Sequence, residues 1–358
     1  MEASATPARL TEARPFGALR SAWLVRPALL ALAGVVTSVA PARADPAAAG
    51  AGGVMALAIV PSSATVFAGT AAGGLYVSGD RGEHWALVGG AVAGLFISAL
   101  AVDPAEPSVV LAGTNGAGVF RSGDGGREWA EANKGLSNLF VEALAVDPEP
   151  PRAAYAATDG GVFQSSDGGR SWKELREGLS DPFVTALAVA PGSGVLYGGT
   201  RSGVILRRDK AAARWTSGPP LCRAPVRGIA VHPSVPATLF AATGAGLFKS
   251  TTAGEVWSSA SRGLTTIAVL TVAIDPGSTG RLYACTGSGL FRSGDGGSSW
   301  GSVDAGSGGS LFNAIAIDRD RGGTILLGGE GAVTRSADGG KSWKTVVLPA
   351  PPPAEEEP

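Results

Sequence analysis

Ser78-Gly79-Asp80-Arg81-Gly82-Glu83-His84-Trp85 is the first of a series of segments that share the pattern Ser-x-Asp-x-Gly-x-x-Trp. Intact copies also begin at Ser122, Ser165, Ser293 and Ser336, and two eroded copies end at Trp215 and Trp257. The copies recur at intervals of 44, 43, 42, 43, 43 and 43 residues, measured between Asp80, Asp124, Asp167, Asp209, Thr252, Asp295 and Asp338. A nearly constant interval of this length predicts a tandem array of structural repeats.

Each repeat contains four short apolar segments separated by Gly, Pro, Asp and Ser, with no helical periodicity. In the second repeat these segments are 99–102, 110–112, 118–120 and the stretch that holds Trp129. Four antiparallel strands in a repeat of this length are typical of a β-propeller blade. The first and last repeats are as apolar as the middle ones, whereas an open solenoid needs polar caps, so we expect a closed ring. The first repeat begins with its first strand and the last ends with its fourth, which predicts closure without strand exchange.

The expected fold is therefore all-β: a seven-bladed β-propeller over residues 54–347, with four antiparallel strands per blade and the Asp-containing segment between the third and fourth strands. Residues 1–44 have the pattern of a signal peptide, in which Arg20 and Arg26 precede an apolar stretch and Ala42-Arg43-Ala44 offers a cleavage site. Residues 45–53 then form a short linker, and residues 348–358 form a disordered tail rich in Pro and Glu. This organisation predicts an exported protein, periplasmic or extracellular, with no membrane span after cleavage; an uncleaved membrane anchor is the alternative.

From Asp45 onward the chain has 24 basic and 28 acidic residues, a net charge of −4. Nothing in this balance indicates a nucleic acid or an anionic membrane as a partner, and we expect a monomer. The two cysteines, Cys222 and Cys285, occupy different repeat positions. Cys285 stands where other repeats have Gly or Ala, so we expect a buried small side chain, with a disulfide as the alternative.

The repeats resemble the Asp-box, or BNR, repeats of sialidases, of xyloglucan-cleaving glycosidases, of the sortilin ectodomain and of photosystem II assembly-factor-like propellers. The resemblance covers residues 54–347 and implies the fold, but not one function. In such a box the carboxylate accepts hydrogen bonds from its own turn, and the Trp ring is buried in the blade. One carboxylate per turn does not suit calcium, so we expect no metal or cofactor and assign a structural role to Asp80, Trp85, Asp124, Trp129, Asp167, Trp172, Asp295, Trp300, Asp338 and Trp343.

Enzymes on repeat folds usually build their sites from insertions in the loops of one face, and the nearly constant interval leaves no room for insertions. A sialidase also needs a tyrosine nucleophile. Tyr155, Tyr197 and Tyr283 share one repeat position with apolar residues such as Phe67 and Leu327, which predicts buried residues of the second strand. The acidic residues that end first strands and the two histidines are expected to be turn residues; they are Asp103, Asp147, Asp275, Asp318, His84 and His232.

Four carboxylates depart from the repeat pattern, and two of them could form the acid–base pair of a xyloglucanase-like glycosidase. They are Glu142, Asp159, Asp181 and Glu330. Glu142 opens a first strand, and Glu330 is expected to replace the Thr that follows the second strand in other repeats. Solvated charges at the rim of the ring are the alternative interpretation.

A basic stretch from Arg201 to Arg227 carries seven basic residues against Asp209 alone, a local net charge of +6. The loops that follow second and fourth strands share one face of a propeller, so Arg201, Arg223, Arg227 and Arg262 are expected on that face. Arg207, Arg208, Lys210 and Arg214 are expected on the other face. Clustered arginines can hold a carboxylate-bearing partner, whereas the alternative is a solvated and diverging blade.

The sequence thus favours an exported, non-catalytic platform that binds a protein or glycan partner. A glycoside hydrolase of the sialidase or xyloglucanase type, acting through the off-repeat carboxylates, is the first alternative. A structural module of a cell-surface assembly is the second.

Overall fold

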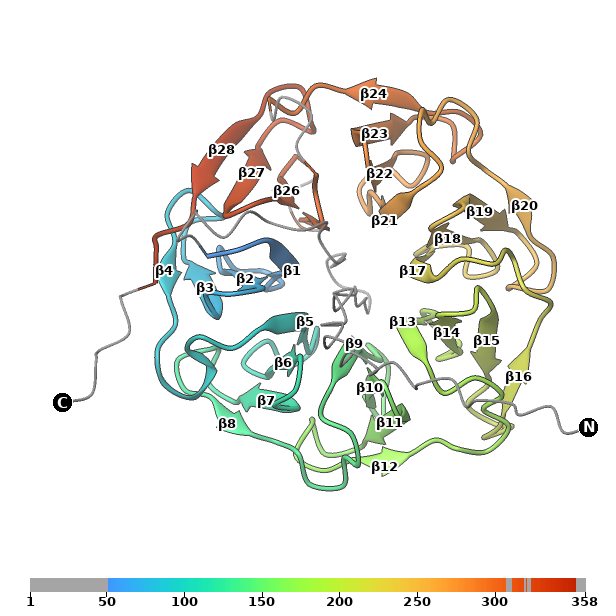
Figure 1. Cartoon of the computed structure of the whole chain (residues 1–358), viewed down its shortest axis with the longest axis horizontal. Coiled ribbons are helices and arrows are strands. Elements are labelled where there is room, and N and C mark those ends of the chain that lie inside the picture. The colour runs from blue at the N-terminus through green and yellow to red at the C-terminus, as the bar shows by residue number, and fades with distance from the viewer. Residues whose placement is uncertain (1–50, 307–310, 319, 321–322, 352–358) are drawn as a thin grey trace, which may run out of the picture.

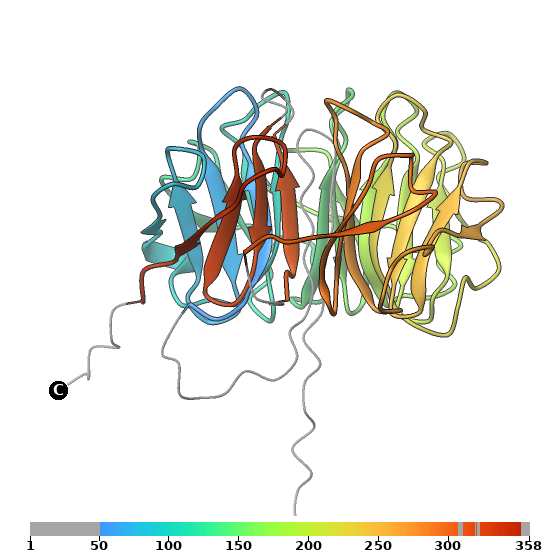
Figure 2. The ribbon, with the colours of Figure 1, turned by 90° about the horizontal axis from the view of Figure 1, so that it is seen from above.

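The computed structural model describes residues 51–306, 311–318, 320 and 323–351. Seven antiparallel sheets of four strands each are arranged in a ring around a central axis (Figures 1 and 2). Within every sheet the strands pair in chain order. These features confirm the predicted all-β, seven-bladed propeller. The predicted signal peptide 1–44 lies outside the described residues, as do 45–50 of the linker and 352–358 of the tail.

The strands of the first three blades are β1 (Val54–Ile59), β2 (Val66–Thr70), β3 (Leu75–Ser78), β4 (Ala86–Leu87), β5 (Ile97–Val102), β6 (Val110–Thr114), β7 (Val119–Ser122), β8 (Ala130–Glu131), β9 (Val141–Val146), β10 (Ala154–Thr158), β11 (Gly161–Ser165) and β12 (Lys173–Glu174). Blades 4 and 5 comprise β13 (Val184–Val189), β14 (Leu196–Thr200), β15 (Ile205–Arg208), β16 (Trp215–Ser217), β17 (Val226–Val231), β18 (Leu239–Thr243), β19 (Gly246–Ser250) and β20 (Ser258–Ser259). Blades 6 and 7 comprise β21 (Val269–Ile274), β22 (Leu282–Thr286), β23 (Gly289–Ser293), β24 (Gly301–Val303), β25 (Ala314–Ile317), β26 (Ile325–Gly328), β27 (Ala332–Ser336) and β28 (Lys344–Val347).

The one helical element of the described chain is the short 3-10 helix η1 (Gly90–Val92), which connects the first two blades. No helix in the described ranges is both long and apolar enough to cross a membrane.

The strand register fixes which loops share a face of the ring. Val54 at the start of β1 pairs with Thr70 at the end of β2, and Ile59 pairs with Val66. The turn after each second strand therefore lies at the same end of the blade as the connection into each first strand. We call this end the top face; the opposite end, which carries the turns between third and fourth strands, is the box face.

Each intact Asp box ties together the turn between the third and fourth strands of its blade. In the first box, Ser78 Oγ donates to Asp80 Oδ1 at 2.8 Å, and Gly82 N donates to Ser78 Oγ at 2.7 Å. Backbone N–H groups of Glu83 and His84 both donate to Asp80 Oδ1 at 2.9 Å. The same network surrounds Asp124, Asp167, Asp295 and Asp338. The carboxylates are therefore engaged in holding the turn.

Blade 4 lacks the Ser and Asp of the box. The residues that take these two positions lie one residue later in the chain than the spacing predicts. Arg208 pairs with Leu196 at the start of β14, as Ser165 pairs with Ala154 at the start of β10. Arg208 thus occupies the Ser position and Lys210 the Asp position, so the assignment of Asp209 to the Asp position is wrong. Lys210 Nζ instead reaches Asp147 Oδ2 of the preceding blade at 2.6 Å, and Asp209 pairs with Arg207.

Second-strand side chains carry the contact from each blade to the next. Tyr155, Tyr197 and Tyr283 are 2%, 1% and 0% exposed, which confirms that they are core residues. The hydroxyl group of Tyr197 donates to the Ala253 carbonyl in the next blade at 3.0 Å. Phe67 takes the tyrosine position in blade 1. A Cβ added to Gly126, the second box glycine of blade 2, would clash with the Phe67 ring. The second box glycine is thus required both by its positive φ and by the ring that lies on it.

Three blade boundaries carry an additional clasp that the repeat analysis did not single out. At the boundary of blades 3 and 4, the backbone N–H of Trp215 donates to the Glu177 carbonyl at 2.9 Å, and its indole Nε1 donates to the Leu175 carbonyl at 2.8 Å. Gly178 follows at a φ of +74°, in a Gly-Leu-Ser segment against the Trp215 carbonyl. Matching bonds join Trp172 to 132–134 and Trp300 to 260–262.

The ring closes between blades 1 and 7 by packing, as predicted, because the first and last sheets keep all four of their own strands. Val54 N donates to the Gly329 carbonyl at 2.8 Å across the joint, and Gly331 N donates to the Gly52 carbonyl at 3.0 Å. Leu348, the first residue of the predicted tail, is buried in the apolar cluster that the two blades share. The closure is therefore a continuous part of the core.

Replacing Gly178 with Ala tests the clasp. The new methyl group would overlap the Trp215 carbonyl oxygen and Arg214 at a backbone conformation that already disfavours alanine. We expect a loss of unfolding free energy at least about 2 kcal/mol greater than that of Gly192→Ala, measured by urea denaturation. Gly192 is the matched control, since its φ is +73° and an added Cβ there would meet no atom within 4 Å. Equal losses in the two variants would contradict the clasp.

Candidate functional site

The eight residues predicted as candidate site residues all lie at the top face. Asp159, Arg201 and Glu330 lie in turns after second strands, and Asp181, Arg223 and Arg262 lie in connections into first strands. Glu142 and Arg227 are the second residues of the first strands β9 and β17.

Four of these residues meet where blades 3 and 4 adjoin. Arg201 Nη2 lies 2.6 Å from Asp159 Oδ1 and 3.8 Å from Glu142 Oε1. The neighbouring Ser202 hydroxyl donates to Asp181 Oδ2 at 2.7 Å. We call Glu142, Asp159, Asp181 and Arg201 the blade 3–4 cluster. The Arg201 guanidinium thus faces the carboxylates of Glu142 and Asp159, and Asp181 is tied to the neighbouring residue of the same turn.

Glu142 reaches this cluster because of a local irregularity in its strand. The register of first and second strands shifts at the second residue of the first strand in several blades, including blades 2 and 4. There the residues at this position are Ser98 and Thr185, whose hydroxyls donate to carbonyl groups of the next blade at 2.6 and 2.7 Å. Glu142 takes the same place with a longer side chain, which extends to Arg201 of blade 4.

Glu330 lies elsewhere on the ring, at the closure, where it forms an isolated β-bridge with Gly53. Ile325 pairs with Ser336 as Ala154 pairs with Ser165, so Leu326 is equivalent to the core tyrosines. Gly329 takes the position of the Thr that ends the second strand in other blades, such as Thr158. The prediction that Glu330 replaces this Thr, and that Leu327 shares the tyrosine position, is therefore wrong by one residue. The turn after the second strand varies in length between blades, which an alignment on the box does not reveal.

Arg223, Arg227 and Arg262 do not take part in the contacts that define the blade 3–4 cluster. Arg223 and Arg262 have exposed side chains. Arg227 is half-buried, and burial lowers the pKa of its guanidinium.

Three of the seven basic residues in the stretch form ion pairs. Arg207 lies 2.8 Å from Asp209 and 4.0 Å from Glu255 of the next blade. Lys210 lies 2.6 Å from Asp147, whose side chain is fully buried. Together with the pairs of Arg201, these contacts link part of the local excess of +6 to acidic residues of the neighbouring blades.

An exposed apolar surface adjoins the cluster. Leu139, Phe140 and Phe183 are 37%, 42% and 43% exposed, in the connections into β9 and β13. Their backbones are fixed: the Phe140 carbonyl accepts from Asp159 N at 3.1 Å, and the Phe183 carbonyl accepts from Arg201 N at 2.9 Å. We call these three residues the aromatic surface. A sequence signal existed, because a Phe also precedes the first strand of blade 2 at Phe96, but the repeat analysis missed it.

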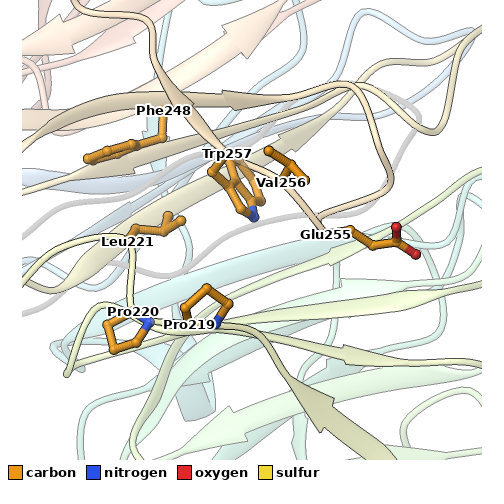
Figure 3. A pocket seen from close by; sticks show the side chains of 7 residues that line it. All are labelled: Pro219, Pro220, Leu221, Phe248, Glu255, Val256 and Trp257. Atoms are coloured by element: carbon orange, nitrogen blue, oxygen red, sulfur yellow. The ribbon is translucent and has the colours of Figure 1, made fainter.

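A small apolar pocket lies at the boundary of blades 4 and 5 (Figure 3). Its volume is 260 Å³, and it is lined by Pro219, Pro220, Leu221, Phe248, Glu255, Val256 and Trp257. This boundary lacks the clasp that joins Trp172, Trp215 and Trp300 to the preceding blade. Instead, Trp257 Nε1 donates to the Gly254 carbonyl of its own box at 2.9 Å. Small-molecule sites usually occupy roughly 300–1,000 Å³, so this hollow lies just below their usual size.

No group of three or more His, Cys, Asp or Glu side chains that could hold a metal ion occurs among the described residues. Cys222 and Cys285 are both free thiols, so the alternative of a disulfide between them is not observed. Cys285 is buried, as its repeat position predicts, and burial raises the pKa of its thiol.

No protein-family model matches the sequence, and no curated protein matches it either. Solved structures do match. The GH74 xyloglucanase from Xanthomonas campestris aligns with a TM-score of 0.67 at 21% identity, over 83% of this chain and 55% of that one. The GH74 enzyme of Niastella koreensis gives 0.68 at 19% identity, over 82% and 54%. YCF48 bound to a D1 peptide gives 0.63 at 15% identity, over 86% of this chain and 99% of that one.

The chain is thus a seven-bladed propeller similar in structure to GH74 xyloglucanases and to YCF48, as the Asp-box repeats predicted. It spans about half the length of the two GH74 structures and nearly the full length of YCF48. At these identities the similarity shows the fold alone.

The box carboxylates give a prediction about acid stability. Hydrogen bonds from the Ser299 hydroxyl and backbone N–H, and then from Ser293, hold the pKa of Asp295 well below its usual range. A carboxylate with a depressed pKa stabilises the fold above its unfolded pKa of about 4 and loses this contribution as the pH falls through its folded pKa. We therefore expect Asp295→Asn to lower Tm by about 2–4 °C at pH 7, with a difference that shrinks below about pH 4.

Thermal unfolding followed by circular dichroism between pH 7 and pH 3 measures this effect. Asp304→Asn is the control, because Asp304 is an exposed acid outside the boxes that accepts a hydrogen bond from the Gly306 N–H at 2.9 Å. A Tm difference for Asp295→Asn that is independent of pH would show that the box is not held by the ionised carboxylate.

Proposed function

We propose that this chain is an exported, non-catalytic platform that binds a protein partner at the top face of blades 3 and 4. The observation that carries the proposal is the pairing of Arg201 with both Asp159 and Glu142 beside the exposed rings of Phe140 and Phe183.

The geometry of the two carboxylates argues against a glycosidase. Such an enzyme places one carboxyl group as the acid and a second as base or nucleophile on either side of a sugar. Here Asp159 and Glu142 lie 2.6 and 3.8 Å from the same nitrogen, Nη2 of Arg201. A sugar could not pass between them without displacing the guanidinium.

The surroundings of the cluster favour binding. Aromatic residues and arginine are enriched at protein interfaces, and a few such side chains usually provide most of the binding energy. Backbone hydrogen bonds fix Phe140 and Phe183 in place, which reduces the entropy lost when a partner binds. The similarity to YCF48, which is bound to a D1 peptide, supports a peptide segment as the recognised element.

Affinity capture from the exported fraction of the source cell tests the binding site. We expect the double variant Phe140→Ala/Phe183→Ala to lose more than about tenfold of partner recovery, because it removes both exposed rings. Ile267→Ala is the matched control, since Ile267 is 72% exposed in the connection into blade 6 at the same face. Release of sugar from xyloglucan or sialosides by the wild-type protein, abolished by Glu142→Gln, would instead establish the glycosidase.

Export is proposed from the basic residues, the apolar stretch and the small-residue cleavage site within residues 1–44. We expect mass spectrometry of the protein recovered outside the cytoplasm to find an N-terminus at Asp45. Replacing the cleavage-site residues Ala42 and Ala44 with bulky Leu should leave the leader attached. Recovery of the intact chain only from the cytoplasm would overturn export.

A further inference from the structure

Within the binding function proposed above, on which this inference rests, we propose that the partner presents a Lys or Arg beside a large apolar side chain. Asp181 is the residue that recognises the positive charge, and the aromatic surface receives the apolar side chain.

Asp181 is held in place by neutral donors. Its Oδ1 accepts from the backbone N–H of Phe183 at 3.0 Å, and its Oδ2 accepts from the Ser202 hydroxyl at 2.7 Å. These bonds orient the carboxylate without cancelling its charge. No basic side chain of the described chain forms an ion pair with Asp181, whose side chain is half-buried. A cation from a partner can therefore bind the Asp181 carboxylate through a charge-assisted hydrogen bond.

Arg201 is not available to an acidic partner in the same way. Its guanidinium lies against Asp159 and Glu142 and stacks 4.9 Å from the centre of the Phe183 ring. A carboxylate brought by a partner would approach a guanidinium that already lies 2.6 Å from Asp159 and 3.8 Å from Glu142, with the carboxylate of Asp181 bonded to the adjacent Ser202. The charge complement of this surface is thus opposite to the one expected from the basic stretch of the sequence.

Phe183 joins the two parts of the surface. The Arg201 guanidinium lies over the Phe183 ring, and the Phe183 backbone N–H donates to the carboxylate of Asp181. Phe183 as a whole remains 43% exposed. Lys and Arg side chains pack their aliphatic stems on apolar surface while the charged end reaches a polar group, and a neighbouring apolar side chain gains contact with the same rings. A cation–apolar pair therefore fits the arrangement better than either feature alone.

Selection of a displayed library of random heptapeptides on the folded full-length protein tests the inference. We expect enrichment of peptides that carry Phe, Leu or Trp within two positions of Lys or Arg. The leading peptide, synthesised with a fluorescent label, should bind Asp181→Asn about tenfold more weakly by fluorescence anisotropy, a difference of about 1.4 kcal/mol. Its binding to Glu330→Gln should be unchanged, because Glu330 is an exposed top-face acid at the closure, far along the ring from blade 4 in the order of blades.

The outcomes separate this inference from the proposed function. Enriched peptides that are acidic or uncharged, yet lose binding to Phe140→Ala/Phe183→Ala, would overturn the charge preference and leave the binding site in place. Peptides that bind this double variant as well as the wild type would overturn both, and so would a selection without enrichment. Weaker binding of the leading peptide at higher salt, retained in Glu330→Gln and reduced in Asp181→Asn, supports the role of Asp181.

Discussion

The close approach of a second-strand side chain to the second box glycine of the next blade is the constraint on which the ring depends. The Phe67 ring occupies the space that a Cβ on Gly126 would need, and Phe240 does the same at Gly297. The box holds that glycine at a positive φ, so the turn that stabilises one blade also forms the seat for its neighbour. Repetition of this contact explains why the interval between boxes varies so little: an insertion would move the seat away from the side chain that fills it.

This constraint limits how the molecule can acquire a function. With turns fixed by hydrogen bonds and short connections, the face of the ring changes by single substitutions at repeat positions more readily than by new loops. The blade 3–4 cluster shows the result. Glu142 takes the position at which Ser98 and Thr185 bond to the next blade. Arg201 follows the second strand of blade 4 in the same way that Asp159 follows the second strand of blade 3. Their meeting requires only side chains long enough to cross one blade boundary.

The sequence predicts the ring well because the box pattern is local and repeated. Its Ser, Asp, Gly and Trp each have a role inside one turn, so each copy of the pattern marks the turn between the third and fourth strands of one blade. Asp209 and Glu330 were each assigned to a repeat position one residue away from the correct one. The correct positions follow from the strand pairing, which the residue types alone do not give. The charge of the basic stretch was misleading for a different reason. Whether Lys210 meets Asp147, or Arg207 meets Glu255, depends on contacts between residues more than forty positions apart, which no pattern within a repeat reveals.

Blade 4 combines these arguments, because it has lost its box and yet remains fully packed. Trp215 is 2% exposed, and it keeps the two bonds to carbonyls of the preceding blade that Trp172 and Trp300 form in blades with an intact box. The ion pair of Lys210 with the buried Asp147 adds a second connection to blade 3 at the box face. With the box face of blade 4 secured in this way, substitutions at its top face, such as Arg201 and Phe183, need not contribute to stability. The same divergence that erodes the repeat therefore leaves blade 4 able to carry a surface for recognition.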